Sequence, residues 1–127
     1  PCKIKILNNA TFHKSNPAIV GVEVLAGNLK TNTHLMKEDG NKASEVKEIQ
    51  SEKKNISLVE QGKQVAVSLP NLTVGRQINE GDILYSNIAE EDFRRLKKLK
   101  KYLNKDEIQV LKEIALIKRK TNNIWGL

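Results

Sequence analysis

The fold is decided by two glycine-containing stretches, AIVGVEVLAGNLKTNTHLM (Ala18–Met36) and GKQVAVSLPNLTVGRQINEGDILYS (Gly62–Ser86). In the first stretch valines occupy every second position from Val20 to Val24, and the QVAVSL segment of the second repeats this spacing. Successive side chains of a strand point to opposite faces, so these valines fall on one face. The pattern predicts strands that bury one side in a small core.

Shorter segments with the same alternation flank these two stretches. Lys3–Leu7 alternates charged and apolar residues, and Ser44–Gln50 alternates again. Between them, Asp39 and Gly40 supply the residues that tight hairpin turns prefer. About six to seven short strands separated by glycine turns predict a mainly β domain, a closed antiparallel barrel over residues 1–87, because closure removes exposed sheet edges.

The apolar period changes after Ser86. Over Phe93–Leu103 the apolar residues recur every three or four positions, which predicts an amphipathic helix. Asn104 is suited to cap a second helix, with Glu107 three residues further on. Residues 88–127 are therefore predicted to form a C-terminal hairpin of two α-helices, packed on the barrel as one structural unit.

The chain carries a formal net charge of +7 and has a pI of about 9.6. Residues 88–127 contain eleven Lys or Arg against six Asp or Glu, whereas residues 1–87 contain eleven against nine. This excess indicates a polyanionic partner, either nucleic acid or an acidic peptide. The alternative interpretation is a lysine-rich helical surface that only contacts solvent.

Several kinds of chemistry find no support in the sequence. Cys2 is the only cysteine, which excludes an internal disulfide and a thiolate metal site. The two histidines, His13 and His34, are far apart, and no GxxxxGKS or GxxxxGKT loop occurs. No apolar run is long enough to cross a membrane. We therefore expect a cytoplasmic monomer without catalytic residues, a metal site or membrane contact.

Five segments occur in an order that resembles one family. They are PCKIKIL, SNPAIVGVEVLAG, QVAVSLP, VGRQINEGDILYS and EEDFRRLKKLKKYL. Together they resemble the C-terminal domain, domain IV, of archaeal and eukaryotic translation initiation factor five-B, the counterpart of bacterial initiation factor two. The resemblance covers essentially the whole chain. The sequence differs from the family pattern at Asn32 and Ala89, where the family usually has glycine and proline.

The resemblance implies a function in translation initiation. The complete factor is a GTPase that joins ribosomal subunits, and GTP and Mg²⁺ are expected on a GTPase domain that this chain lacks. This chain would not itself be an enzyme. Its barrel would be similar to the second domain of elongation factor Tu. It would bind the methionylated acceptor end of initiator tRNA and the C-terminal tail of initiation factor one-A, on the ribosome.

Binding an aminoacylated acceptor end requires close backbone approach, an apolar slot and cations for phosphate. The resemblance to the bacterial aminoacyl pocket indicates the first two, and three basic residues, one of them in the Val74–Gln77 loop, are candidates for phosphate contact. The predicted tRNA-binding residues are Gly21, Val22, Val65, Ala66, Arg76, Lys47 and Lys14. The alternative interpretation is barrel packing for Val22, Val65 and Ala66, and ordinary surface charge for Lys14 and Lys47.

The factor one-A tail is expected to be acidic with apolar anchors. A groove between barrel and helices would suit it. The predicted residues of this groove are Lys112, Lys118, Arg119 and Lys120 at the rim and Trp125 near the floor. Trp125 could instead be a structural plug. Two other functions stay open, a pure protein-docking module and a nonspecific RNA-binding barrel.

Overall fold

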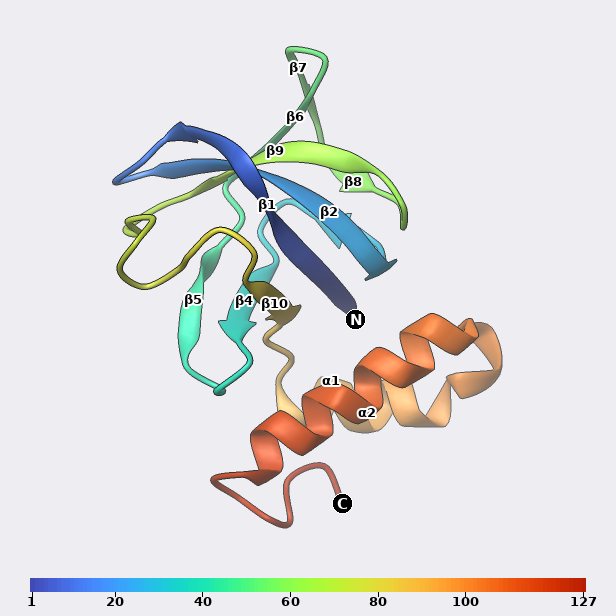
Figure 1. Cartoon of the computed structure of the whole chain (residues 1–127). Coiled ribbons are helices and arrows are strands. Elements are labelled where there is room, and N and C mark those ends of the chain that lie inside the picture. The colour runs from blue at the N-terminus through green and yellow to red at the C-terminus, as the bar shows by residue number, and fades with distance from the viewer.

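The computed structural model describes residues 1–127 and is mainly β, with two α-helices after the last strand (Figure 1). The strands are β1 Cys2–His13, β2 Ala18–Gly27, β3 Leu29–Lys30, β4 His34–Lys37, β5 Lys42–Glu45, β6 Glu48–Ser51, β7 Lys54–Ile56, β8 Leu58–Val59, β9 Gln64–Leu69 and β10 Ile83–Ser86. The helices are α1 Glu90–Lys98, a 3-10 turn Lys100–Tyr102, and α2 Lys105–Arg119. Neither α-helix combines the length and the apolar character that a membrane crossing demands.

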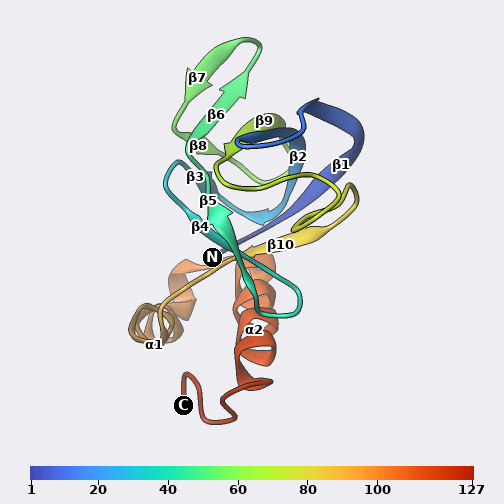
Figure 2. The same cartoon turned by 90° about the vertical axis from the view of Figure 1, so that its left-hand side faces the viewer.

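Eight strands form one antiparallel sheet in the order β5-β4-β10-β1-β2-β9-β6-β7. The sheet curls around its core, and the β6–β7 hairpin projects from it (Figures 1 and 2). β3 and β8 pair separately. The helices lie below the curled sheet, at the end where β10 finishes. The predicted mainly β architecture with two C-terminal helices is confirmed.

Two details of the prediction are corrected. The sheet is a half-barrel rather than a closed barrel, and the chain forms ten strands rather than six or seven. β5 pairs with β4, whereas β6, which follows after only Val46 and Lys47, pairs with β9. This segment therefore runs from one side of the curled sheet to the other. Strands of two to four residues are too short for a readable alternation of side chains, so the sequence pattern merged or missed them.

The turns between the short strands explain in part why the sequence predicted too few strands. Glu52 and Lys53 both have positive φ, at 52° and 67°, and form the tip of the β6–β7 hairpin. A hairpin turn with two left-handed residues usually carries asparagine or glycine, so Glu52-Lys53 gave no turn signal. Asn32, with φ of 68°, adopts the left-handed conformation that asparagine tolerates.

The interior of the half-barrel is a cluster of 18 buried residues. Val20, Val22 and Val24 of β2 belong to it, so the alternation that decided the fold describes the real inward face. Ile4 of β1 and Val67 of β9, on the two strands that flank β2, belong to the same cluster. Full burial of one such side chain contributes roughly 1.5–3 kcal/mol.

A second buried cluster joins the helices to the lower end of the sheet. It combines Met36 and Tyr85 from the strands with Ile114 of α2. Beside it, Lys3 Nζ of β1 pairs with Glu113 of α2 at 3.2 Å and lies 5.6 Å from the centroid of the Tyr85 ring. The helical layer is therefore held on the sheet by both apolar packing and an ion pair.

The start of α2 is fixed as the sequence indicated. The Asn104 side chain accepts a 2.8 Å hydrogen bond from the Glu107 backbone N–H, and the Glu107 carboxylate accepts one from the Asn104 N–H at 3.1 Å. This capping box satisfies two donors at the helix start. The predicted division between residues 1–87 and 88–127 stays a prediction.

An irregular segment of β1 covers the outer face of β2. Four residues of β1, Leu7–Ala10, lie opposite the single residue Gly21. The Glu80 carboxylate holds this bulge, because it accepts a 2.7 Å hydrogen bond from the Thr11 hydroxyl and a 3.1 Å bond from a backbone N–H within the bulge. A Cβ atom on Gly21 would lie 2.9 Å from the Ala10 Cβ. Gly21 is therefore required for the close contact of two strands.

We predict that Gly21→Ala lowers the free energy of unfolding by about 1–3 kcal/mol, because the added methyl overpacks this contact. Urea denaturation measures the loss. Adding Ala10→Gly removes the opposing methyl and should recover part of the lost stability. A double variant no more stable than Gly21→Ala alone would contradict the assigned contact.

Candidate functional site

The predicted apolar slot of the tRNA site is divided between two faces of the sheet. Val22 and Val65 are register partners on adjacent strands, and both belong to the buried barrel core. Val22 has no exposed surface. Both side chains therefore pack the interior, as the alternative interpretation held.

Gly21 and Ala66 are also register partners, but they face the opposite side of the sheet from Val22 and Val65. Gly21 is buried beneath the β1 bulge, and Ala66 is half-buried with Gln50 of β6 beside it. The structure therefore does not bring the four predicted residues together in one pocket. The close backbone approach at Gly21 is made by β1.

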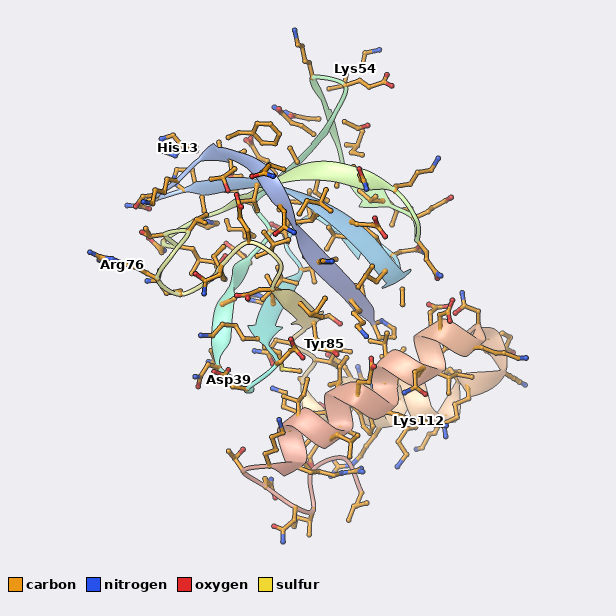
Figure 3. All side chains as sticks on the ribbon, in the orientation of Figure 1. His13, Asp39, Lys54, Arg76, Tyr85 and Lys112 are labelled. Carbon is orange, nitrogen blue, oxygen red and sulfur yellow. The ribbon has the colours of Figure 1, made fainter.

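The predicted cations Lys14 and Arg76 lie on two loops that are joined to each other. The Val74 N–H donates a 2.9 Å hydrogen bond to the Lys14 carbonyl. Ser15 and Thr73 share a 2.7 Å hydrogen bond between their hydroxyl groups. Both cationic side chains are exposed, and Figure 3 shows Arg76 directed away from the barrel. Two backbone segments far apart in sequence thus present cations from one place.

Lys47, the third predicted cation, is exposed between β5 and β6 and lies beside the start of the loop that carries Arg76. Its backbone N–H donates a 3.0 Å hydrogen bond to the carbonyl of Ser68, which lies near the end of β9. Segment 68–76 therefore touches or contains the backbone of all three predicted cations. Together Lys14, Lys47 and Arg76 form what we call the loop surface.

Sequence reasoning missed one residue beside the loop surface. Phe12 is 68% exposed at the end of β1, two residues before Lys14. The hydrogen bonds of Thr11 to Glu80 and of His13 Nδ1 to the Pro17 carbonyl, at 2.7 Å, hold the backbone on both sides of it. An exposed aromatic ring among cations can stack on a nucleic acid base. The available signal was a single aromatic residue in the mainly polar segment ATFHKS.

The residues predicted for the factor one-A tail are divided between two hollows. Lys112 and Arg119 line a groove of about 440 Å³ between α1 and α2, which we call the helix groove. Lys118 and Trp125 line a separate hollow of about 430 Å³ between the helices and the β4–β5 hairpin, which we call the junction pocket. Lys120 lines neither, and its Nζ donates a 3.4 Å hydrogen bond to the Glu38 carbonyl.

The helix groove has an apolar floor and a cationic rim. Its apolar lining residues are Phe93, Ile108, Leu111, Ala115, Leu116 and Leu127. Four cations stand around them, since Lys97 and Lys100 join Lys112 and Arg119. Figure 3 shows Lys112 on the side of α2 that faces away from the sheet, and Leu116 and Leu127 are 66% and 70% exposed. The contributions of Lys97 and Lys100 were missed, although their three-residue spacing on a predicted helix was visible.

Trp125 is part of the packing beneath these hollows. It is buried, and its ring centroid lies 4.7 Å from that of Phe93, with the two planes tilted by 49°. Arg119 Nε donates a 2.7 Å hydrogen bond to the Trp125 carbonyl, and Lys97 Nζ donates a 3.0 Å bond to the next carbonyl. These contacts match the structural plug that the sequence left open as an alternative.

Lys118 is the half-buried cation of the junction pocket. Its ammonium group donates a hydrogen bond to Asn87 Oδ1 and lies 5.9 Å from the centroid of the Trp125 ring. Burial, and secondly the charge of Lys42, hold the pKa of Lys118 below its ordinary value. Both causes act against the charged form of the side chain.

Comparison with known proteins places this geometry in a family. The family model of Elongation factor Tu domain 4 matches residues 1–85, which comprise almost the whole half-barrel. The probable translation initiation factor IF-2 of Methanocella arvoryzae is 43% identical over 127 residues, which cover 99% of this chain and 21% of that protein. The corresponding factor of Methanopyrus kandleri is 44% identical over 128 residues, with 100% and 21% coverage.

A solved structure shows the same architecture, helices included. The crystal structure of GDP-bound aIF5B from Aeropyrum pernix is similar with a TM-score of 0.92 and 36% sequence identity. The match covers 98% of this chain and 21% of that one. The chain thus spans about a fifth of the length of the relatives that it matches. It belongs to the Elongation factor Tu domain 4 family and is a C-terminal domain of the archaeal IF-2/aIF5B type of translation initiation factor.

Proposed function

We propose that this domain is the module of a ribosomal-subunit-joining GTPase that docks the tail of initiation factor one-A and binds the methionylated acceptor end of initiator tRNA. The helix groove is the observation that carries the proposal. It offers an apolar floor within a rim of four cations. A short tail with apolar anchors and acidic flanks is complementary to it in both respects.

The rim cations suit a salt-sensitive contact. Lys100 and Lys112 are exposed, and neither takes part in an ion pair. Charges of this kind increase the rate of encounter with an oppositely charged partner. The apolar floor would then retain the anchors, because apolar burial contributes about 25 cal/mol per Å². Charge would thus guide the tail, and apolar contact would hold it.

The loop surface supports the second part of the proposal. Lys14, Lys47 and Arg76 stand on joined segments and have no acidic partner within ion-pair distance. Separated cations can follow successive phosphates of a single-stranded end, and the exposed ring of Phe12, two residues before Lys14, could contact a base. The acceptor end would lie along the outside of the half-barrel, because Val22 and Val65 fill its interior.

The remaining expectations complete the proposal. The domain would act as a monomeric part of a cytoplasmic factor on the ribosome, and it would contribute binding rather than catalysis. The guanine nucleotide and its Mg²⁺ would be bound by another part of the complete protein, because the sequence contains no GxxxxGKS or GxxxxGKT loop to hold phosphates.

We predict that reversing two rim charges, Lys112→Glu with Lys100→Glu, weakens binding of an acidic tail peptide at least about tenfold, because two attractive charges become repulsive. Methionylated initiator tRNA should bind as before. Isothermal titration calorimetry with each ligand measures both effects. Lys120→Glu, outside the groove, is the matched control. An equal loss of both ligands would refute separate surfaces.

We predict that Arg76→Ala weakens binding of methionylated initiator tRNA and lowers the steepness of its salt dependence by about 0.7, the value for one lost single-strand phosphate contact. Arg76 is exposed, so the fold should survive. Fluorescence anisotropy over a salt series measures both quantities. Affinity and slope unchanged from the parent domain would remove Arg76 from the tRNA site.

A further inference from the structure

The junction pocket has a chemistry of its own. It lies where three parts of the chain meet, the β4–β5 hairpin, the link from β10 to α1, and the C-terminal end of α2 (Figures 1 and 2). Its volume is about 430 Å³. Leu35, Ile88 and Trp125 form apolar walls, while Lys42, Lys118 and Asn87 supply polar groups.

The polar groups of this pocket are mainly hydrogen-bond donors. Lys118 Nζ gives one hydrogen bond to Asn87 Oδ1, which leaves two of its three protons free. That bond occupies the amide oxygen of Asn87, and the amide nitrogen donates no hydrogen bond within the protein, so this lining residue keeps a free donor. Lys42 is exposed and belongs to no ion pair.

Negative charge does not neutralise this donor set. Glu90 is the only carboxylate among the lining residues. Its Oε1 accepts a hydrogen bond from Arg94 one turn along α1, and the two side chains form an ion pair. The two lysines of the pocket therefore have no carboxylate partner in the protein. Two unpaired cations and a spare amide donor around one hollow make an anion site.

We propose that the junction pocket binds a phosphate group of single-stranded RNA, with Lys42, Lys118 and the Asn87 amide as its ligands. Both cations are lysines, which act on phosphate as compact point charges, whereas bidentate recognition of a carboxylate favours arginine. The apolar walls leave space for the sugar or base attached to the phosphate. The site lies on the helix side of the half-barrel and does not depend on the loop surface.

The state of Lys118 agrees with such a ligand. Burial and the neighbouring Lys42 both disfavour its charged form, and its pKa lies below the ordinary value. An anion between the two ammonium groups would replace their repulsion by attraction. A bound phosphate would thus stabilise the charged form of Lys118, which the free pocket disfavours.

Trp125 makes this site directly measurable, because it is the only tryptophan of the chain and lines the pocket. The experiment titrates the domain with oligouridine and follows Trp125 fluorescence over a salt series. We expect a saturable change. Lys42→Ala and Lys118→Gln should each weaken binding and lower the salt slope by about 0.7. Lys105→Ala, at the exposed first residue of α2 and outside both the helix groove and the junction pocket, is the matched control and should leave the titration unchanged.

Three results would overturn the proposal. One is the absence of any saturable Trp125 response in the folded domain. The second is the same affinity and salt slope for Lys42→Ala, an exposed position whose replacement should not disturb folding, as for the parent domain. The third is a polyglutamate peptide that saturates the same response as well as oligouridine does, since the pocket would then be a carboxylate site. None of these outcomes depends on Arg76, so failure here is separate from failure of the tRNA proposal.

Discussion

The apolar contact between α2 and the lower end of the half-barrel determines where every candidate surface on the helices lies. Ile114 of α2 packs with Met36 and Tyr85 of the sheet, and Figure 3 shows Tyr85 between the two layers. The Lys3–Glu113 ion pair joins the same helix to β1. With α2 seated in this way, one of its sides faces α1 and forms the helix groove, while its C-terminal end meets the β4–β5 hairpin and forms the junction pocket. Loss of this contact would remove the junction pocket, whose lining comes from both the sheet and the helices.

The candidate binding cations lie on three separate surfaces of the domain. The loop surface belongs to the barrel and depends on the joined loops that carry Lys14 and Arg76. The helix groove combines cations with an apolar floor, and the junction pocket combines two lysines with an amide donor. The excess positive charge, +7 overall, therefore includes cations in three local environments, which differ in the apolar and polar groups beside the cations. The three proposed ligands, a peptide tail, an acceptor end and a phosphate of single-stranded RNA, are each assigned to a different environment.

The sequence predicts those features that depend on local pattern. The valines of β2 fix the inward face, and Asn104 fixes the start of α2, because strand alternation and helix capping are encoded within a few residues. The short strands were not countable, since two left-handed residues without glycine form the β6–β7 turn. The placement of Gly21 was not predictable either. Its neighbour is a bulge of β1, which no local pattern indicates. The separation of Lys118 from Lys112 follows only from the position of α2 between α1 and the β4–β5 hairpin.

The most direct test of the proposal that this domain holds the methionylated acceptor end of initiator tRNA is the rate at which the aminoacyl ester hydrolyses with and without the domain. Elongator methionyl-tRNA serves as the control, because it carries the same amino acid on a different body. We predict slower hydrolysis for the initiator species when the folded domain is present, and a smaller effect or none for the elongator. Equal hydrolysis rates for initiator tRNA with and without the folded domain would contradict it, and the helix groove would then stand as the domain's principal binding surface.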